Sequence, residues 1–211
     1  MGPAVVVHRP VPPSGGELPL SRLLPPAPAA RGALVRPGDV GGPAAWQALV
    51  HDGVLVRVRG DAAAPSGTAV TPEVRARALA VPARAVVAGP TAAWVHCGVA
   101  DGEVLHLAYV PGTHRPPAWS GVRAWSAPGI AGDCLPLGGV RVETPVRAAV
   151  DVALHLPDGE AVALLVALAR AGVDLDAAGR ALELRLRVVG RPRARAVLGA
   201  ARRALAADAP G

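Results

Sequence analysis

The chain has 211 residues, of which 51% are hydrophobic, 18% are charged and only 2% are aromatic. That length suits one domain, or a small domain followed by a larger one, and Val, Leu and Ala must fill the core because Phe is absent. No stretch approaches the ~18 uncharged apolar residues of a membrane span, and the first ten residues lack the apolar segment of a signal peptide. The composition therefore argues against a membrane protein, and we expect a cytoplasmic one with reduced cysteines.

Positive charge is concentrated in one part of the sequence. The net charge is +6, yet residues 180–205 hold eight arginines and a single acid, Glu183, so this segment carries +7 and the remainder −1. A basic stretch on a nearly neutral body is typical of a protein that binds a polyanion. The alternative is a solvated basic helix face without a partner.

The first part of the chain predicts an arm and then a small domain. Repeated Pro and Gly residues in 1–30 break any helix, which favours a loose arm. Residues 31–71 predict a winged-helix-like domain, in which Pro43 opens a short helix that Gly53 ends.

A basic-faced strand follows that helix. In residues 54–60 the three valines alternate with Arg57 and Arg59, so we expect a strand with an apolar face and a basic face. Residues 69–71 are the expected returning strand of the hairpin. A short helix followed by such a hairpin is the outline of a winged helix-turn-helix.

Residues 72–207 predict a mixed α/β domain that ends in a helical, Arg-rich segment. Thr71-Pro72 and Thr144-Pro145 each combine an N-cap with a first-turn proline, and both predict helix starts. Short strands are expected at 85–87, 104–110, 122–125 and 140–142, and further helices at 91–98, 145–156, 160–171, 174–190 and 193–207. The expected fold class is therefore α+β.

Three runs in this order carry a family resemblance: AVVAGPTAAWVHCGV (85–99), LPLGGVRVETPVRAAVDVALHLP (135–157) and GRPRARAVLGAARRAL (190–205). Together they resemble the AbiEi-family antitoxins of bacterial type IV toxin–antitoxin systems, of the actinobacterial type. The family's Ser/Thr-Pro-x-Arg-Thr motif and helical Asp correspond to Thr144–Ala148 and Asp151. Departures from the pattern are Cys97 and the end of the basic strand, which reads Arg59-Gly60-Asp61-Ala62 without the family's Tyr.

The resemblance implies a DNA-binding transcriptional regulator that is not an enzyme. It implies double-stranded DNA of its own promoter as one partner, and a nucleotidyltransferase-type toxin as another. Many relatives continue into an endonuclease-like domain, which we expect this chain, ending at Gly211, to lack. The alternative is a protein-interaction module that does not bind DNA, because the expected recognition helix, 43–52, contains no arginine.

Candidate DNA-binding residues lie in two places. Gln47 on the expected recognition helix can pair with adenine through two hydrogen bonds, and Arg57 and Arg59 on the strand would contact phosphates. Trp46 is expected in the core. The second group would contact phosphates with a steep salt dependence, or dock an acidic toxin surface; it comprises Arg185, Arg187, Arg191, Arg193 and Arg195.

Three other residues are expected to be structural. Arg147 and Asp151 stand one helical turn apart and can form an ion pair, and Trp94 lies in the first family-like run. Neither a C-x-x-C nor an H-x-x-x-H spacing exists, so no metal site is predicted. Phosphate-binding and dinucleotide-binding glycine motifs are also absent, and we expect no cofactor.

Overall fold

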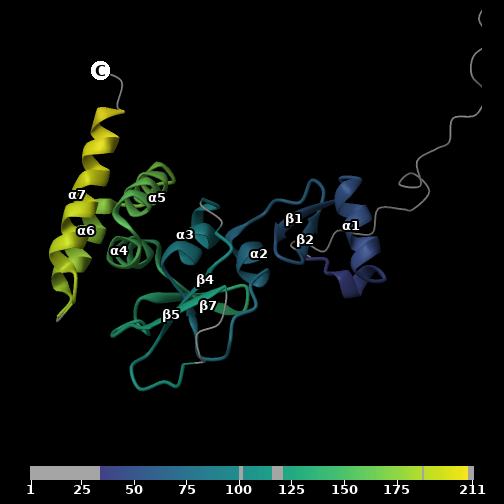
Figure 1. The fold of residues 1–211 in the computed structure, drawn as a ribbon, viewed down its shortest axis with the longest axis horizontal. Helices are drawn as coiled ribbons and strands as arrows, with labels where there is room; N and C mark the ends of the chain where they lie inside the picture. Colours follow the sequence, from purple (N-terminus) through teal and green to yellow (C-terminus); the bar gives the residue numbers. More distant parts are fainter. Residues whose placement is uncertain (1–33, 100–101, 116–120, 187, 209–211) are drawn as a thin grey trace, which may run out of the picture. The chain divides into compact units, whose positions relative to one another are not determined.

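Helices and two sheets alternate along the chain in a computed structural model that describes residues 34–99, 102–115, 121–186 and 188–208 (Figure 1). Seven α-helices, one short 3-10 helix, a two-stranded sheet and a five-stranded sheet make up these described ranges, so the fold class is α+β. The predicted arm, 1–30, lies outside the described residues. Among the described helices, none combines the length and apolarity needed to cross a membrane.

A helix–hairpin unit, Leu34–Pro65, begins the described chain. It consists of a 3-10 helix (Pro37–Val40), α1 (Pro43–His51), β1 (Leu55–Arg59) and β2 (Ala62–Pro65). The two strands are antiparallel, and Val35 bridges to Ala63 on the other side of β2. A small core of Trp46, Leu55 and Ala63 holds α1 against the hairpin.

The hairpin differs from the prediction in its second strand. Arg59 pairs with Ala62, so the chain reverses over Gly60 and Asp61, and β2 is the returning strand instead of residues 69–71. Gly60 has φ of +55°, a conformation that glycine adopts without strain and that suits a tight hairpin turn. The Gly-Asp pair is the turn signal that the prediction overlooked.

The buried face of β1 is also the opposite of the predicted one. Leu55 is buried, whereas Val54 and Val56 are 46% and 50% exposed. Leu55 and Arg57 share the other face by the two-residue period of a strand, and the pairing of β1 with β2 is irregular between Arg57 and Arg59. Each arginine lies over a different indole ring, Arg57 over that of Trp46 and Arg59 over that of Trp94.

The five-stranded sheet has mixed strand directions. Its strands are β3 (Val86–Val87), β4 (Leu105–Tyr109), β5 (Val122–Ser126), β6 (Cys134–Leu137) and β7 (Val140–Glu143), in the order β5-β4-β3-β7-β6. Pairs β4/β5 and β3/β7 are parallel, and pairs β3/β4 and β6/β7 are antiparallel. The strand that sequence reasoning missed, β6, contains Pro136, which is tolerated because β6 lies at the edge of the sheet.

Helices pack beside this sheet. They are α2 (Pro72–Arg77), α3 (Gly89–Cys97), α4 (Pro145–His155), α5 (Asp158–Arg170), α6 (Leu175–Leu184) and α7 (Arg191–Ala207). The two predicted threonine caps are confirmed: the Thr71 hydroxyl accepts from the Val74 N–H, and the Thr144 hydroxyl from the Arg147 N–H.

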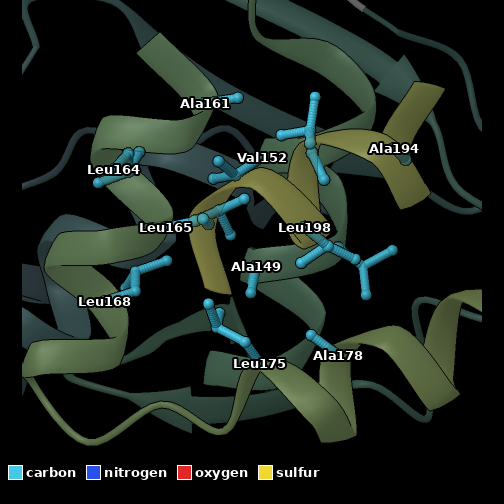
Figure 2. Packing of buried hydrophobic residues seen from close by; sticks show 14 of the residues in the cluster. Ala149, Val152, Ala161, Leu164, Leu165, Leu168, Leu175, Ala178, Ala194 and Leu198 are labelled. Carbon is cyan, nitrogen blue, oxygen red and sulfur yellow. The ribbon is translucent and has the colours of Figure 1, made fainter. Parts of the chain in front are cut away.

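The main core lies where α4 meets its neighbours. This helix contacts α3, α5, α6 and α7, and its residues from Arg147 to Ala153 are all buried. Figure 2 shows leucines of α5 and α7 converging with small residues of α4 and α6. Because alanines occupy so many core positions, the helices approach closely and leucines such as Leu165 and Leu198 fill the remaining space.

Candidate functional site

An exposed arginine and an exposed glutamine meet on the helix–hairpin unit. Arg57 of β1 donates from Nη2 to Oε1 of Gln47 on α1 across 3.4 Å. The Arg57 guanidinium also lies 4.8 Å from the ring centroid of Trp46. Two predicted site residues are thus brought together, on the α1–β1 face that we define by Gln47 and Arg57.

The buried indole of Trp46 supports this face from below. The indole is only 2% exposed, and its Nε1 donates to the Val35 carbonyl at 3.2 Å. The expectation that Trp46 belongs to the core is confirmed. Because the indole ring cannot turn away, it holds the guanidinium of Arg57 in a defined orientation while the remaining N–H groups of that side chain stay exposed.

Arg59, by contrast, points into the protein. Its Nη2 donates to the carbonyl of Gly102 at 2.6 Å and of Val104 at 3.5 Å, and its guanidinium lies 5.0 Å from the ring centroid of Trp94. Trp94 itself is 4% exposed, which fits the structural role expected for it. Arg59 therefore anchors the hairpin to the loop before β4 and does not share the exposed face of Arg57.

The basic C-terminal segment is largely neutralised within the fold. Five of its arginines form ion pairs with carboxylates, four of which lie outside the segment; the pairs are Arg180–Asp174, Arg185–Asp151, Arg193–Asp158, Arg195–Glu183 and Arg202–Asp176. Arg191 donates to the carbonyl of Arg185, and Arg187 lies outside the described residues. Counting charges along the sequence suggested an open basic surface, but helix packing brings acids from α4, α5 and α6 to these arginines.

A second group of charged residues lies beside the sheet, and its members are buried or partly buried. We call it the acid–arginine cluster: Asp133, Glu143, Arg147, Asp151 and Arg185. Arg147 donates to Asp151 at 3.1 Å and to Asp133 at 2.8 Å, and Arg185 donates to Asp151 at 2.9 Å. The predicted Arg147–Asp151 pair is confirmed. Sequence reasoning missed the other members because they reach this place from the residue before β6, the end of β7 and the residue after α6.

Glu143 is the most enclosed member of the cluster. Its side chain is fully buried, and one carboxyl oxygen accepts the Gly89 N–H at 2.7 Å. Burial, together with the negative charge of Asp151, raises the pKa of Glu143 well above its ordinary value. Burial beside Asp151 therefore favours the protonated form of Glu143.

Asp151 takes the charged role in this pair. Burial by itself would raise the pKa of Asp151, but the hydrogen bond from Glu143 and the charges of Arg147 and Arg185 hold it below the ordinary value. Nε1 of Trp125 also donates to Asp151, at 3.3 Å. Because Glu143 and Asp151 are at most 1% exposed, the pair joins elements of the fold and does not face a substrate.

His96 holds the backbone next to this cluster. Its Nε2 lies 2.6 Å from the Glu143 carbonyl, and burial lowers the pKa of the imidazole. A carbonyl oxygen only accepts, so the neutral ring carries its proton on Nε2. No three His, Cys, Asp or Glu side chains are placed to hold a metal ion in the part of the chain that the structure describes.

Comparison of this chain with known proteins finds a likeness to a solved structure but no family and no curated relative. No protein-family description matches it, and no curated protein matches it. The crystal structure of the RV2827C protein from Mycobacterium tuberculosis is similar at 20% sequence identity and a TM-score of 0.41, over 86% of this chain and 78% of that chain. A likeness at this level carries no argument about activity.

Proposed function

We propose that this protein is a DNA-binding transcriptional regulator of the AbiEi antitoxin type, which contacts double-stranded DNA through the α1–β1 face. One observation carries the proposal: an exposed arginine is fixed on a buried indole beside an exposed glutamine, on a helix that precedes a hairpin. The winged-helix assignment of Leu34–Pro65 belongs to the same proposal.

The two side chains suit different parts of a duplex. Arg57 carries a permanent charge and several donors, so it contacts phosphate and positions the protein. Gln47 lies on the helix and offers the amide that pairs with adenine in the major groove, a contact worth about 1–3 kcal/mol of discrimination between bases. The hydrogen bond from Arg57 to Oε1 of Gln47 couples the two contacts, because a change in the position of Arg57 changes the position of the glutamine amide.

The ion pairs of the C-terminal segment limit which arginines are available to contact DNA. Arg193 and Arg195 are engaged with Asp158 and Glu183, so phosphate contact by them would break existing ion pairs. We therefore place the DNA contact at Gln47 and Arg57 and give the C-terminal arginines a minor share. The resemblance adds a nucleotidyltransferase-type toxin as the proposed protein partner.

The test is binding of the purified protein to its own upstream DNA and to a shuffled duplex, at two salt concentrations. We expect tighter binding to its own DNA, which Arg57→Gln weakens on both duplexes and Gln47→Ala weakens mainly on its own. Arg141→Gln is the matched control, since Arg141 is also an exposed strand arginine but lies on β7. Equal binding to both duplexes, or binding that Arg57→Gln leaves unchanged, contradicts the proposal.

A protein-interaction module that does not bind DNA is the second candidate, and one observation favours it. Leu184, Leu186 and Val189, around the end of α6, are 83%, 89% and 95% exposed. Exposed apolar side chains that gather in one patch are typical of protein interaction sites. This candidate predicts no retardation of either duplex, and loss of partner binding in a Leu184→Ser, Leu186→Ser variant whose DNA binding is unchanged.

A further inference from the structure

A cavity of about 530 Å³ lies between α5, the loop before β4, and the strands β4 and β5. Its volume falls within the ~300–1,000 Å³ typical of small-molecule sites. The cavity is separate from the α1–β1 face and from the acid–arginine cluster, since it shares no residue with either.

One wall of the cavity is apolar. Leu156 precedes α5, and Ala163, Leu164 and Ala167 lie in the middle and second half of that helix. Ala163, Leu164 and Ala167 lie about one helical turn apart along α5, so they form an apolar strip, with the exposed Glu160 one turn before it. Such a strip binds the hydrocarbon part of a ligand by removing it from water.

The opposite wall carries one cation. Arg123 and His106 are directly paired residues on β5 and β4. Burial, with the nearby charge of Arg123 among lesser causes, lowers the pKa of His106 to about 4, so the imidazole is neutral at pH 7. The structure records no ion pair between Arg123 and any residue of the described ranges. Arg123 is thus an exposed guanidinium that no carboxylate of the described residues pairs with.

Two carboxylates in the cavity limit how many negative charges a ligand can carry. Glu103 and Glu160 also line the cavity, and both are exposed. A ligand with two or more anionic groups would bring one of them toward these carboxylates. We propose that the cavity binds a small monocarboxylic acid with an apolar body, whose carboxylate pairs with Arg123 and whose hydrocarbon packs on α5.

The cavity also borders the anchor of the hairpin. Gly102 and Val104 line it, and their carbonyls accept the hydrogen bonds of Arg59. A change in DNA affinity on ligand binding would follow if the proposed function holds. Carboxylate binding itself is measured without DNA, so failure of one proposal is distinguishable from failure of the other.

The test is calorimetric titration of the full chain with octanoate, below its micelle concentration, in parallel with octan-1-ol, octylamine and octanedioate. We expect octanoate to bind at least tenfold more tightly than the other three. Arg123→Gln should weaken octanoate at least tenfold, and the control Arg141→Gln should bind it like the unmodified protein. Ala163→Trp, at an exposed wall position, should abolish binding by filling the cavity.

Several outcomes overturn the proposal. Equal affinity for octanoate and octan-1-ol would show an apolar cavity without carboxylate recognition. Octanoate binding that survives Arg123→Gln or Ala163→Trp would place the ligand elsewhere, and absence of octanoate binding would remove the site. Circular dichroism of each variant establishes that it is folded before its titration is interpreted.

Discussion

Arg185, the residue that follows α6, donates a hydrogen bond of 2.9 Å to Asp151 in α4, 34 residues earlier in the chain. Asp151 is 1% exposed and also forms an ion pair with Arg147. One buried carboxylate is thus shared by two guanidinium groups from different parts of the chain. Breaking a buried ion pair from one side leaves an uncompensated charge, which costs far more than losing an exposed pair.

The first prediction follows from this shared carboxylate. Asp151→Asn keeps the side-chain shape but removes the buried anion that Arg147 and Arg185 share, leaving them only the half-exposed Asp133, and we expect the free energy of unfolding to fall by about 3–5 kcal/mol. Arg180→Gln is the control: it removes an ion pair whose arginine is 68% exposed, and unfolding should hardly change. Urea denaturation at pH 7 measures both. A small loss in Asp151→Asn would show that the cluster is weakly coupled to folding.

The second prediction concerns pH. Since the pKa of Glu143 is raised in the folded protein, the folded state holds a proton that the unfolded state releases above its ordinary pKa of about 4.3. The stability that this proton contributes is fully present below that pH and is lost as pH rises toward the folded pKa. Glu143→Gln imitates the protonated form, so its free energy of unfolding should decline less between pH 5 and pH 8.

The matched control for that measurement is Glu160→Gln, which changes an exposed carboxylate on α5. Its pH dependence should parallel that of the unmodified protein. Parallel curves for Glu143→Gln as well would mean that Glu143 is ionised in the folded state. Urea denaturation at pH 5, 6, 7 and 8 gives the four points needed.

The third prediction concerns the turn between β6 and β7. Gly138 has φ of +56°, and a Cβ there would lie 2.5 Å from the Glu73 carbonyl oxygen of α2. Gly139 has φ of +87° with no atom within 4 Å of such a Cβ. Gly139→Ala should therefore cost about 1 kcal/mol from backbone strain alone, and Gly138→Ala clearly more. Thermal unfolding of the two variants compares them, and equal losses would contradict the close approach of α2 to this turn.

The fourth prediction separates the two groups of candidate DNA-binding arginines. Loss of one phosphate contact lowers the slope of log affinity against log salt by about one. We expect this change for Arg57→Gln and not for Arg195→Gln, because Arg195 binds both oxygens of Glu183 at 3.0 and 2.9 Å. Fluorescence anisotropy with a labelled duplex measures the slopes, and the reverse result would return the DNA contact to the C-terminal segment.

Local signals predicted α4 and its surroundings well. Thr144 and Pro145 set the start of the helix, and apolar residues three and four apart set its buried stripe, because both depend on helix geometry alone. The Arg147–Asp151 pair could be read from the same geometry. Glu143 and Arg185 could not, since their contact with Asp151 exists only after β7 and α6 are packed against α4.

The α1–β1 face shows a different limit. Alternation in residues 54–60 predicts two faces of a strand, but it does not say which face is covered. Apolarity favoured the valines, whereas the indole rings of Trp46 and Trp94 accept the aliphatic and guanidinium parts of Arg57 and Arg59 instead. That outcome depends on two rings placed by other elements, one of them more than thirty residues away, so no property of the strand itself could reveal it.

The first turn of α7 binds the corner between α4 and α5, which comes earlier in the chain. Arg193 donates to the carbonyls of Ala153, Leu154 and Leu156 at the end of α4 and pairs with Asp158 at the start of α5. During translation at roughly 5–20 residues per second, the 39 residues between Leu154 and Arg193 take about 2–8 s to appear. Throughout that interval the carbonyls at the end of α4 lack their hydrogen bonds from Arg193. The apolar surface that Val197 and Leu198 later cover is also exposed to water. The emergence of α7 therefore sets how long the nascent chain is a target for chaperones and proteases.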